Sequence, residues 1–246
     1  MSKSVFITGA SSGLGRQLAS EFARRGYDLA LAARQFDVLQ QIKAELEQGH
    51  GVRVRIYSLD VSDPEKVRDT LNIACAELGK LDIVVANAGL GSDGRIGRID
   101  FANTRRMYEV NVIGACATID AAVSLFKTQG RGQIVAMSSV ASWRGLPGSG
   151  AYSASKAAVS VYMEALRAEA LGKNLTVTVI YPGYIDTPMN NQLKHRPFLL
   201  PLAEGGKRIA DAIVQGRRRA VIPGYPWLLL RPLLQLLPTT LIGKLF

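Results

Sequence analysis

The chain has 246 residues, of which 48% are apolar and 20% charged, and its formal net charge is +10. That apolar content can fill the core of one large α/β domain, and no linker, repeat or low-complexity tract divides the chain. The only cysteines, Cys75 and Cys116, lie in apolar helical contexts. We therefore expect them to be packing residues and expect no metal site.

Much of the positive charge lies near the end of the chain. Residues 207–246 contain seven basic residues and one acidic residue, which accounts for +6 of the +10. No aromatic stacking platform or nucleic-acid-binding module accompanies this charge, so we expect no nucleic-acid partner. Strand-like residues begin by Ser4 and leave no room for a signal peptide, so we expect a cytoplasmic protein.

Strand-like and helix-like segments alternate along the chain. The expected strands are Val5–Ile7, Leu29–Ala33, Val52–Leu59, Leu81–Ala86, Gln133–Met137, Leu175–Ile180 and Ala220–Ile222. The expected helices are Leu14–Arg25, Phe36–Glu47, one beginning at Asp63-Pro64, Phe101–Val110, Val112–Lys127 and Tyr152–Ala170. This order predicts one doubly wound, Rossmann-type parallel sheet of about seven strands over residues 1–222, with helices on both faces.

A glycine-rich turn connects the first expected strand to the first helix. Its sequence is Thr8-Gly9-Ala10-Ser11-Ser12-Gly13-Leu14-Gly15, a GxxxGxG spacing that departs from GxGxxG. Missing side chains let a backbone approach a dinucleotide pyrophosphate, and the following helix offers unpaired N–H groups to it. The turn predicts dinucleotide binding; a simple glycine turn is the alternative.

The second expected strand ends at Ala33-Arg34. Enzymes that use NAD usually place a carboxylate about here, whereas an arginine suits the 2′-phosphate of NADP through charge-assisted hydrogen bonds. The sequence therefore favours NADP(H) over NAD(H), unless Arg34 is only a solvated surface arginine.

Tyr152 and Lys156 are four residues apart on one expected helix, thirteen residues after Ser139. The ammonium at i+4 can lie near the phenol, and we expect it to lower the pKa of Tyr152 toward the range useful for proton transfer. Ser139 follows the neighbouring strand, so its hydroxyl can polarise the same substrate carbonyl.

The order of these motifs resembles the short-chain dehydrogenase/reductase family over residues 4–222. The motifs are the glycine turn, Asp60-Val61, Asn87-Ala88-Gly89, Asn111, Ser138-Ser139, Tyr152 with Lys156, and Pro182-Gly183 followed by Thr187. The resemblance implies an oxidoreductase that transfers hydride between a nicotinamide cofactor and a carbonyl or alcohol, commonly as a homodimer or homotetramer. A non-catalytic NADP(H)-binding sensor or scaffold is the alternative.

The resemblance also implies a role for each motif residue. Tyr152 would be the general acid or base, Ser139 would orient the substrate oxygen, and Lys156 would hold the nicotinamide ribose. Asn111 would anchor a water on the proton route. The remaining implied cofactor contacts are Asp60 and Val61 at the adenine, Asn87 with Ala88 and Gly89 at the adenine ribose, and Pro182, Gly183, Ile185 and Thr187 at the nicotinamide.

Several of these residues have simpler alternative roles. Asp60 and Asn87 are common turn formers, Asn111 could interrupt a helix, and Thr187 could cap one. Ser138 is the nearest rival to Ser139, although the thirteen-residue gap to Tyr152 favours Ser139.

Two segments are expected to vary with the substrate. The loop 141–150 follows the serine pair, and the segment 188–206 follows the nicotinamide contacts. The second segment is rich in apolar residues and could form a lid over an apolar or lipid-like substrate, or could pack on its own core.

The C-terminal tail, residues 223–246, contains leucine-rich runs broken by Pro226, Pro232 and Pro238. It is too short and too interrupted to span a bilayer. With Trp227 and nearby basic residues it fits a peripheral contact of residues 225–246 at the inner face of a membrane. A contact with a second subunit fits equally well.

Overall fold

A seven-stranded parallel sheet forms the centre of the computed structural model, which describes residues 2–91, 94–193 and 195–245. The strand order is β3-β2-β1-β4-β5-β6-β7. The strands are β1 (Ser4–Thr8), β2 (Asp28–Ala33), β3 (Val54–Ser58), β4 (Ile83–Ala86), β5 (Gly132–Met137), β6 (Leu175–Pro182) and β7 (Arg219–Ile222). The predicted doubly wound fold is confirmed, and the order reverses between β1 and β4, where a ligand crevice is expected.

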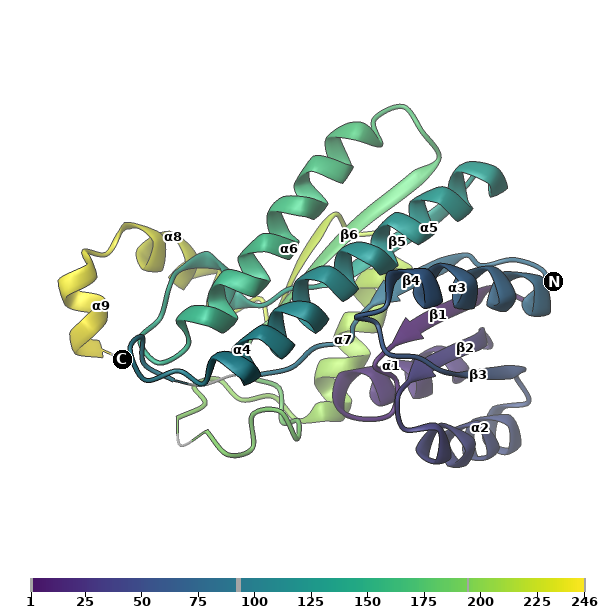
Figure 1. The fold of residues 1–246 in the computed structure, drawn as a ribbon, viewed down its shortest axis with the longest axis horizontal. Coiled ribbons are helices and arrows are strands. Elements are labelled where there is room, and N and C mark those ends of the chain that lie inside the picture. The colour runs from purple at the N-terminus through teal and green to yellow at the C-terminus, as the bar shows by residue number, and fades with distance from the viewer. Residues whose placement is uncertain (1, 92–93, 194, 246) are drawn as a thin grey trace.

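Helices cover both faces of the sheet (Figure 1). Helices α1 (Gly13–Ala23), α2 (Phe36–His50) and α7 (Leu202–Val214) pack into one core, and α3 (Pro64–Leu78), α5 (Ala115–Gln129) and α6 (Gly150–Glu169) pack into the other. Alternate strand residues face opposite cores, so Val5 and Ile7 join the first and Phe6 the second. Burial on both faces explains why β1, β2 and β4 are mainly apolar runs.

The two helices predicted over residues 101–127 form one continuous helical segment in the structure. Helix α4 (Phe101–Tyr108) continues through a π-helical turn, η1 (Glu109–Gly114), into α5. Asn111 therefore does not break the helix. Gly114 packs against Val61, where a Cβ on the glycine would meet Cγ2 at 2.5 Å, so close packing accompanies the widened turn.

This continuous helix, Phe101–Gln129, is also long and apolar enough to cross a membrane by length and composition. Half of its most apolar window is buried inside the fold. Ile119, Ala122 and Phe126 pack into the second core. The helix is therefore accounted for as a core helix of the sheet.

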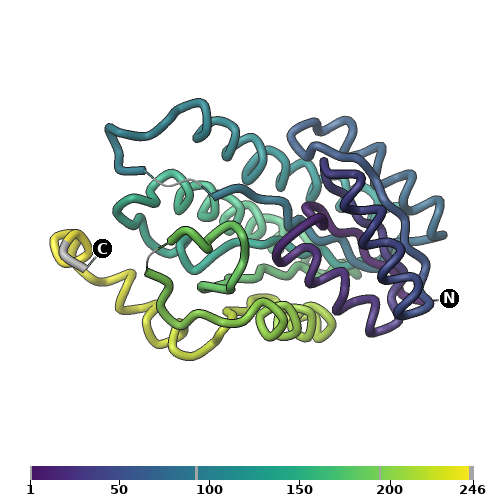
Figure 2. Tube along the Cα trace, turned by 90° about the horizontal axis from the view of Figure 1, so that it is seen from below, coloured from purple at the N-terminus to yellow at the C-terminus, as the bar shows by residue number. Residues whose placement is uncertain are grey.

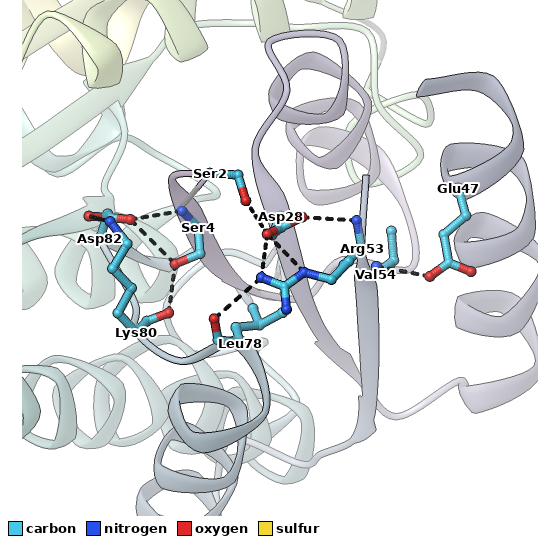
Figure 3. A network of polar contacts seen from close by, with 9 residues as sticks. All are labelled: Ser2, Ser4, Asp28, Glu47, Arg53, Val54, Leu78, Lys80 and Asp82. Carbon is cyan, nitrogen blue, oxygen red and sulfur yellow. Dashed lines mark hydrogen bonds and ion pairs between the residues drawn. The ribbon is translucent and has the colours of Figure 1, made fainter. Parts of the chain in front are cut away.

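Polar contacts fasten the amino ends of the strands, away from the carboxyl ends (Figure 3). The buried Asp28 accepts hydrogen bonds from the Arg53 backbone at 2.9 Å and from its guanidinium at 2.7 Å. Asp82 accepts from the Ser4 backbone at 2.9 Å and from Lys80 at 3.0 Å. Burial raises the pKa of Asp28, but the bonds from Arg53 and Ser2 outweigh it and hold that pKa below its usual value.

The segment after β6 is divided differently from the predicted lid over residues 188–206. Residues 202–206 already belong to α7, where Gly205 and Gly206 pack closely on Ile185 and Gln17. The irregular part ends in a bridge between Ile185 and Leu200. Beyond β7, helices α8 (Trp227–Leu236) and α9 (Thr239–Leu245) form a short tail at one end of the molecule (Figures 1 and 2).

Candidate active site

A cleft of about 410 Å³ lies at the carboxyl ends of the strands. Of the residues predicted to form the site, all except Thr8 and Asn111 line it. Its lining includes Gly9, Ser11, Ser12, Gly13, Leu14, Gly15, Arg34, Asp60, Val61, Asn87, Ala88, Gly89, Ser139, Tyr152, Lys156, Pro182, Gly183, Ile185 and Thr187. The fold thus collects segments from six strand ends into one concave surface.

The glycine turn depends on close backbone approaches. Gly9 has φ +67° and Gly13 has φ +51°, a region that favours glycine. A Cβ on Gly15 would lie 2.1 Å from the Gly9 oxygen. The turn is therefore tight enough to bring the amino end of α1 to the cleft. Ser12 makes no side-chain cap there, so the first-turn N–H groups of α1 remain available to an anion.

Thr8 and Asn87 support this turn from behind. The Thr8 hydroxyl accepts hydrogen bonds from the Asn87 and Ala88 backbones at 3.0 and 3.1 Å. The Asn87 amide donates to the oxygens of Thr8 and Gly9 at 2.8 and 3.3 Å. The Asn87 amide thus braces the turn, a role that the expected adenine-ribose contact did not include.

Arg34 and Asp60 line the same end of the cleft with different surroundings. Arg34 is exposed, and within the ranges that the structure describes no ion pair or side-chain hydrogen bond holds its guanidinium. Asp60 is paired with Arg106 of α4 and accepts from the Ser62 hydroxyl at 2.7 Å. Burial raises the pKa of Asp60, but these bonds outweigh it and lower the pKa overall. The guanidinium of Arg34 is therefore available to a ligand, whereas the Asp60 carboxylate is already bound by Arg106 and Ser62.

Tyr152, from α6, is half-buried beside Ser139 at the other end of the cleft. Burial raises the pKa of Tyr152, the Ser139 hydroxyl lowers it, the Tyr184 hydroxyl raises it, and the net direction is upward. The prediction that Lys156 lowers the pKa of Tyr152 is therefore wrong. The ammonium is 5.9 Å from the centre of the phenol ring, and desolvation by burial is the largest effect on the phenol pKa.

Lys156 is buried, and a backbone oxygen of β5 holds its ammonium. Its Nζ donates to the Met137 oxygen at 3.0 Å, at the end of β5. Burial lowers the pKa of Lys156 to about 8. The ammonium is thus fixed within the cleft and can change its charge close to neutral pH.

The two neighbouring serines have different partners. Ser138 contacts the Lys156 oxygen at 3.0 Å and the Ser160 hydroxyl at 2.7 Å, which places it in the packing between β5 and α6. Ser139 accepts from the Ala141 backbone at 3.1 Å and interacts with Tyr152. Ser139 is therefore the serine placed to share a substrate oxygen with the phenol.

Asn111 is 1% exposed and lies just behind the cleft. Its amide donates to the Leu90 oxygen at 2.9 Å and to the Ser155 hydroxyl at 3.1 Å, and its oxygen accepts from the Leu90 backbone at 2.7 Å. A Cβ on Gly89 would lie 3.3 Å from both Asn111 Oδ1 and Lys156 Nζ. Asn111 thus ties the loop after β4 to α6, and Gly89 lies close to both Asn111 and Lys156.

The chain after Gly183 closes over the cleft. Thr187 approaches the Gly13 position, and Met189 approaches Gly91, where a Cβ would meet Cγ at 3.2 Å. Asn190 holds this segment by donating to the Ile185 oxygen at 2.8 Å. Met189 and Asn190 line the cleft. Asn190 was not predicted, because nothing in its local sequence marks its return to Ile185.

The cleft fits a dinucleotide with its adenine end near Arg34 and its nicotinamide end near Tyr152. The backbone cradle at Gly9 and Gly15 has no room for side chains, Gly13 has a positive φ, and the exposed Arg34 lines the same cleft. Among the described residues, no group of three or more His, Cys, Asp or Glu side chains could hold a metal ion.

The chain matches the model of the short chain dehydrogenase family over residues 3–197. It is 38% identical to an uncharacterized oxidoreductase of Mycobacterium tuberculosis, over 98% of this chain and 96% of the relative. It is also 38% identical to 11-beta-hydroxysteroid dehydrogenase 1A of Arabidopsis thaliana, over 76% of this chain and 53% of that protein.

The chain is also similar to solved structures of dehydrogenases. An alcohol dehydrogenase from the archaeon Thermococcus sibiricus, complexed with 5-hydroxy-NADP, has a TM-score of 0.81 at 31% identity and covers 90% of this chain and 94% of its own. A short-chain dehydrogenase from Sphingobium yanoikuyae in complex with NADPH has a TM-score of 0.82 at 26% identity, with 91% and 89% covered.

Proposed function

This chain belongs to the short-chain dehydrogenase family of oxidoreductases, and from that premise we propose that it transfers hydride between NADP(H) and a carbonyl or secondary alcohol. The observation that carries this proposal is the placement of Tyr152, Ser139 and Lys156 at one end of the cleft whose other end holds the glycine turn and Arg34. One continuous cleft thus offers a dinucleotide site and a proton donor.

Tyr152 is the proposed general acid for carbonyl reduction. Its raised pKa keeps the phenol protonated at neutral pH, so it can donate a proton to the oxygen that becomes negative. The Ser139 hydroxyl can donate a second hydrogen bond to that oxygen. The bound nicotinamide would supply or accept the hydride.

Lys156 and Asn111 are proposed to support this proton transfer. The Lys156 ammonium favours developing negative charge on the phenol oxygen, because opposite charges stabilise one another in a desolvated site. Asn111 holds the Leu90 loop and α6 together. It is proposed to anchor a water there on the proton route to Lys156.

Arg34 is proposed to select NADP(H). The unpaired guanidinium can form a charge-assisted, bidentate contact with a phosphate. The neighbouring carboxylate, Asp60, is already paired with Arg106, so it does not compete for the arginine.

The proposed substrate is apolar or lipid-like. Met189, which lines the cleft, is 50% exposed, and Phe198 and Leu199 of the same segment are 49% and 39% exposed. Apolar surfaces of this kind favour an apolar ketone or alcohol and exclude water. The Arabidopsis relative is named for a hydroxysteroid, which is consistent with this class.

The tail is proposed to rest on a membrane surface at the cytoplasmic side. Leu228, Leu229, Leu233 and Leu236 are all more than half exposed on α8, and the chain has no acidic residue after Asp211. An apolar helical face without acids suits an anionic lipid surface. A second copy of the chain is the competing occupant, since the family resemblance implies a homodimer or homotetramer.

A spectrophotometric panel tests the function. NADPH and NADH are each oxidised with ketones that range from small and polar to long-chain and apolar. The proposal expects faster turnover with NADPH and with the apolar ketones. Nucleotide binding without turnover of any ketone would instead favour a sensor or scaffold that keeps the cofactor site.

A further inference from the structure

Helix α8 contacts both loops that flank the catalytic tyrosine. One loop follows Ser139 and contains the 3₁₀ turn η2 (Val140–Trp143) and Arg144. The other is the chain after β6, from Gly183 to Leu200. Figure 1 shows α8 next to the carboxyl ends of the strands, outside the layers of the sheet. No residue of α8 lines the cleft, so any effect on the site must act through these loops.

Trp227 is the contact to the chain after β6. It is 7% exposed, and its ring lies 6.2 Å from that of Tyr184 and 5.7 Å from that of Phe198, edge to face in the second pair. A Cβ on Gly183 would lie 2.3 Å from the indole Nε1. The indole therefore packs directly on the backbone of a residue that lines the cleft.

The Trp227 indole contributes packing contacts and no hydrogen bond among the residues that the structure describes. Its Nε1 is buried and has no hydrogen-bond partner in the part of the chain that the structure describes. Buried indoles usually find such a partner, so packing against Gly183, Tyr184 and Phe198 is what this ring contributes. A phenylalanine can reproduce most of that packing, whereas an alanine cannot.

Arg144 is the contact to the loop after Ser139. Its guanidinium donates to the oxygens of Gln235 and Leu237, both at 2.9 Å. Gln235 is in the last turn of α8 and Leu237 is the residue that follows the helix, where carbonyls lack partners within the helix. Arg231 of α8 in turn lies 5.4 Å from the centre of the Trp143 ring. The loop and the helix thus hold each other at two points.

We infer that α8 is a structural part of the active site that sets the distance between these two loops, with Trp227 and Arg144 as positioning residues. The inference rests on the proposed function and extends it to a segment in which no site residue was predicted. Tyr184, which Trp227 contacts, is close enough to Tyr152 to influence its pKa. Direct contacts therefore join α8 to Gly183, which lines the cleft, and to Tyr184.

Three variants test this inference: Trp227→Ala, Trp227→Phe, and Gln235→Ala as a control on the same helix. The Gln235 side chain is exposed, and its substitution keeps the carbonyl that Arg144 uses. Two quantities are measured, kcat/KM with NADPH and the best ketone, and the dissociation constant of adenosine 2′,5′-bisphosphate. The second reports only the adenine end, which Trp227 does not contact.

Trp227→Ala is expected to lower kcat/KM by at least about tenfold, because small misplacements of a reacting pair cost large factors in rate. The dissociation constant of the bisphosphate should change by less than about twofold, because the substitution removes no contact at the adenine end of the cleft. Trp227→Phe and Gln235→Ala should remain near the wild-type kcat/KM.

Loss of kcat/KM and bisphosphate binding together would indicate a general collapse and would overturn the inference. So would a Trp227→Ala protein with wild-type kcat/KM. If Trp227→Ala does not fold by circular dichroism, Arg144→Ala replaces it, since that half-buried side chain is outside the two cores. Arg144→Ala is then expected to show the same split. A wild-type protein that turns over no ketone would refute the proposed function instead.

Discussion

Lys156 combines full burial with a position beside the proton donor. Its pKa of about 8 means that the ammonium is charged below that pH and loses its charge as the pH rises through it. The Tyr152 pKa is raised above its ordinary value of 10, so the phenol stays protonated over the same range. Loss of the Lys156 charge is thus the first change that an increase in pH brings to this pair.

We therefore predict that kcat/KM for ketone reduction falls as the pH rises past about 8. The measurement is a pH profile of kcat/KM for the wild type and for Lys156→Met. The variant should be slow and lack this falling limb, because methionine does not titrate. A limb near pH 8 that persists in Lys156→Met would assign it to another group.

Arg34 is the residue on which cofactor selection depends. Arg34→Ala should weaken NADPH binding by about 10- to 100-fold, since a hydrogen bond to a charged group contributes about 1.5–3 kcal/mol. NADH binding should change little, because NADH lacks the 2′-phosphate. Dissociation constants for both nucleotides give the result. Arg16→Ala is a matched control, because Arg16 is exposed on α1 and pairs with Glu45 outside the cleft.

Equal loss of NADPH and NADH binding in Arg34→Ala would contradict this role. It would indicate a contact with a part of the cofactor that both nucleotides share. Unchanged NADPH binding would return Arg34 to the alternative of a solvated surface arginine.

At the scale of elements, the approach of α1 to β1 depends on Gly15. A Cβ there would lie 2.1 Å from the Gly9 oxygen and 2.6 Å from Asn87 Nδ2. Gly15→Ala should therefore force α1 away from the turn, lower the free energy of unfolding by about 1–3 kcal/mol and weaken NADPH binding. Thermal unfolding and nucleotide titration measure the two effects.

Gly49→Ala is the matched control for this prediction. Gly49 lies in α2, is exposed, and has nothing within 4 Å of the added Cβ. The substitution should stabilise the protein by about 0.5–1 kcal/mol, because alanine loses less backbone entropy in a helix. Equal behaviour of the two alanine variants would show that the space around Gly15 is not limiting.

The sheet could be predicted because its local and global signals agree. Strands β1, β2 and β4 are buried along their whole length, so they appear in the sequence as mainly apolar runs, and turn residues follow each of them. The continuous helix across Asn111 could not be predicted in this way. The widened turn depends on the packing of Gly114 against Val61, a contact between residues more than fifty positions apart.

The components of the cleft could also be predicted from their motifs, whereas their electrostatics could not. The spacing of Tyr152 and Lys156 indicates only that they share a helix face. Burial decides the direction of the Tyr152 pKa, and burial depends on the whole fold. For the same reason the contact of Trp227 with Gly183 had no local signal in the sequence.

At the scale of the molecule, three consecutive arginines near the C-terminus are separated from the apolar helices of the tail. Arg217 and Arg218 precede β7 and Arg219 begins it, whereas α8 and α9 follow the strand. All three arginines have contacts within the fold: the Arg217 guanidinium donates to the Gln215 side chain, Arg219 pairs with Glu164, and the Arg218 oxygen accepts from Arg167. A lipid contact through α8 would thus depend chiefly on its exposed leucines.

We predict that combined Leu229→Ser, Leu233→Ser and Leu236→Ser lower the partition onto vesicles by at least about tenfold, since burying one leucine contributes about 1.5–3 kcal/mol. The vesicles contain phosphatidylcholine with phosphatidylserine, and co-sedimentation gives the bound fraction. Val161→Ser is the control, because Val161 is equally exposed but lies on α6. Unchanged partition together with a smaller molar mass would assign the leucines to a second copy.

The measurement that tests the central claim most directly compares the wild type with Tyr152→Phe. Oxidation of NADPH is followed by its absorbance with the best ketone, and NADPH binding is followed in the same samples. The account predicts that Tyr152→Phe lowers kcat by about 10²- to 10⁴-fold, the range for loss of a general acid, while NADPH binding is retained. Wild-type turnover in Tyr152→Phe would contradict it.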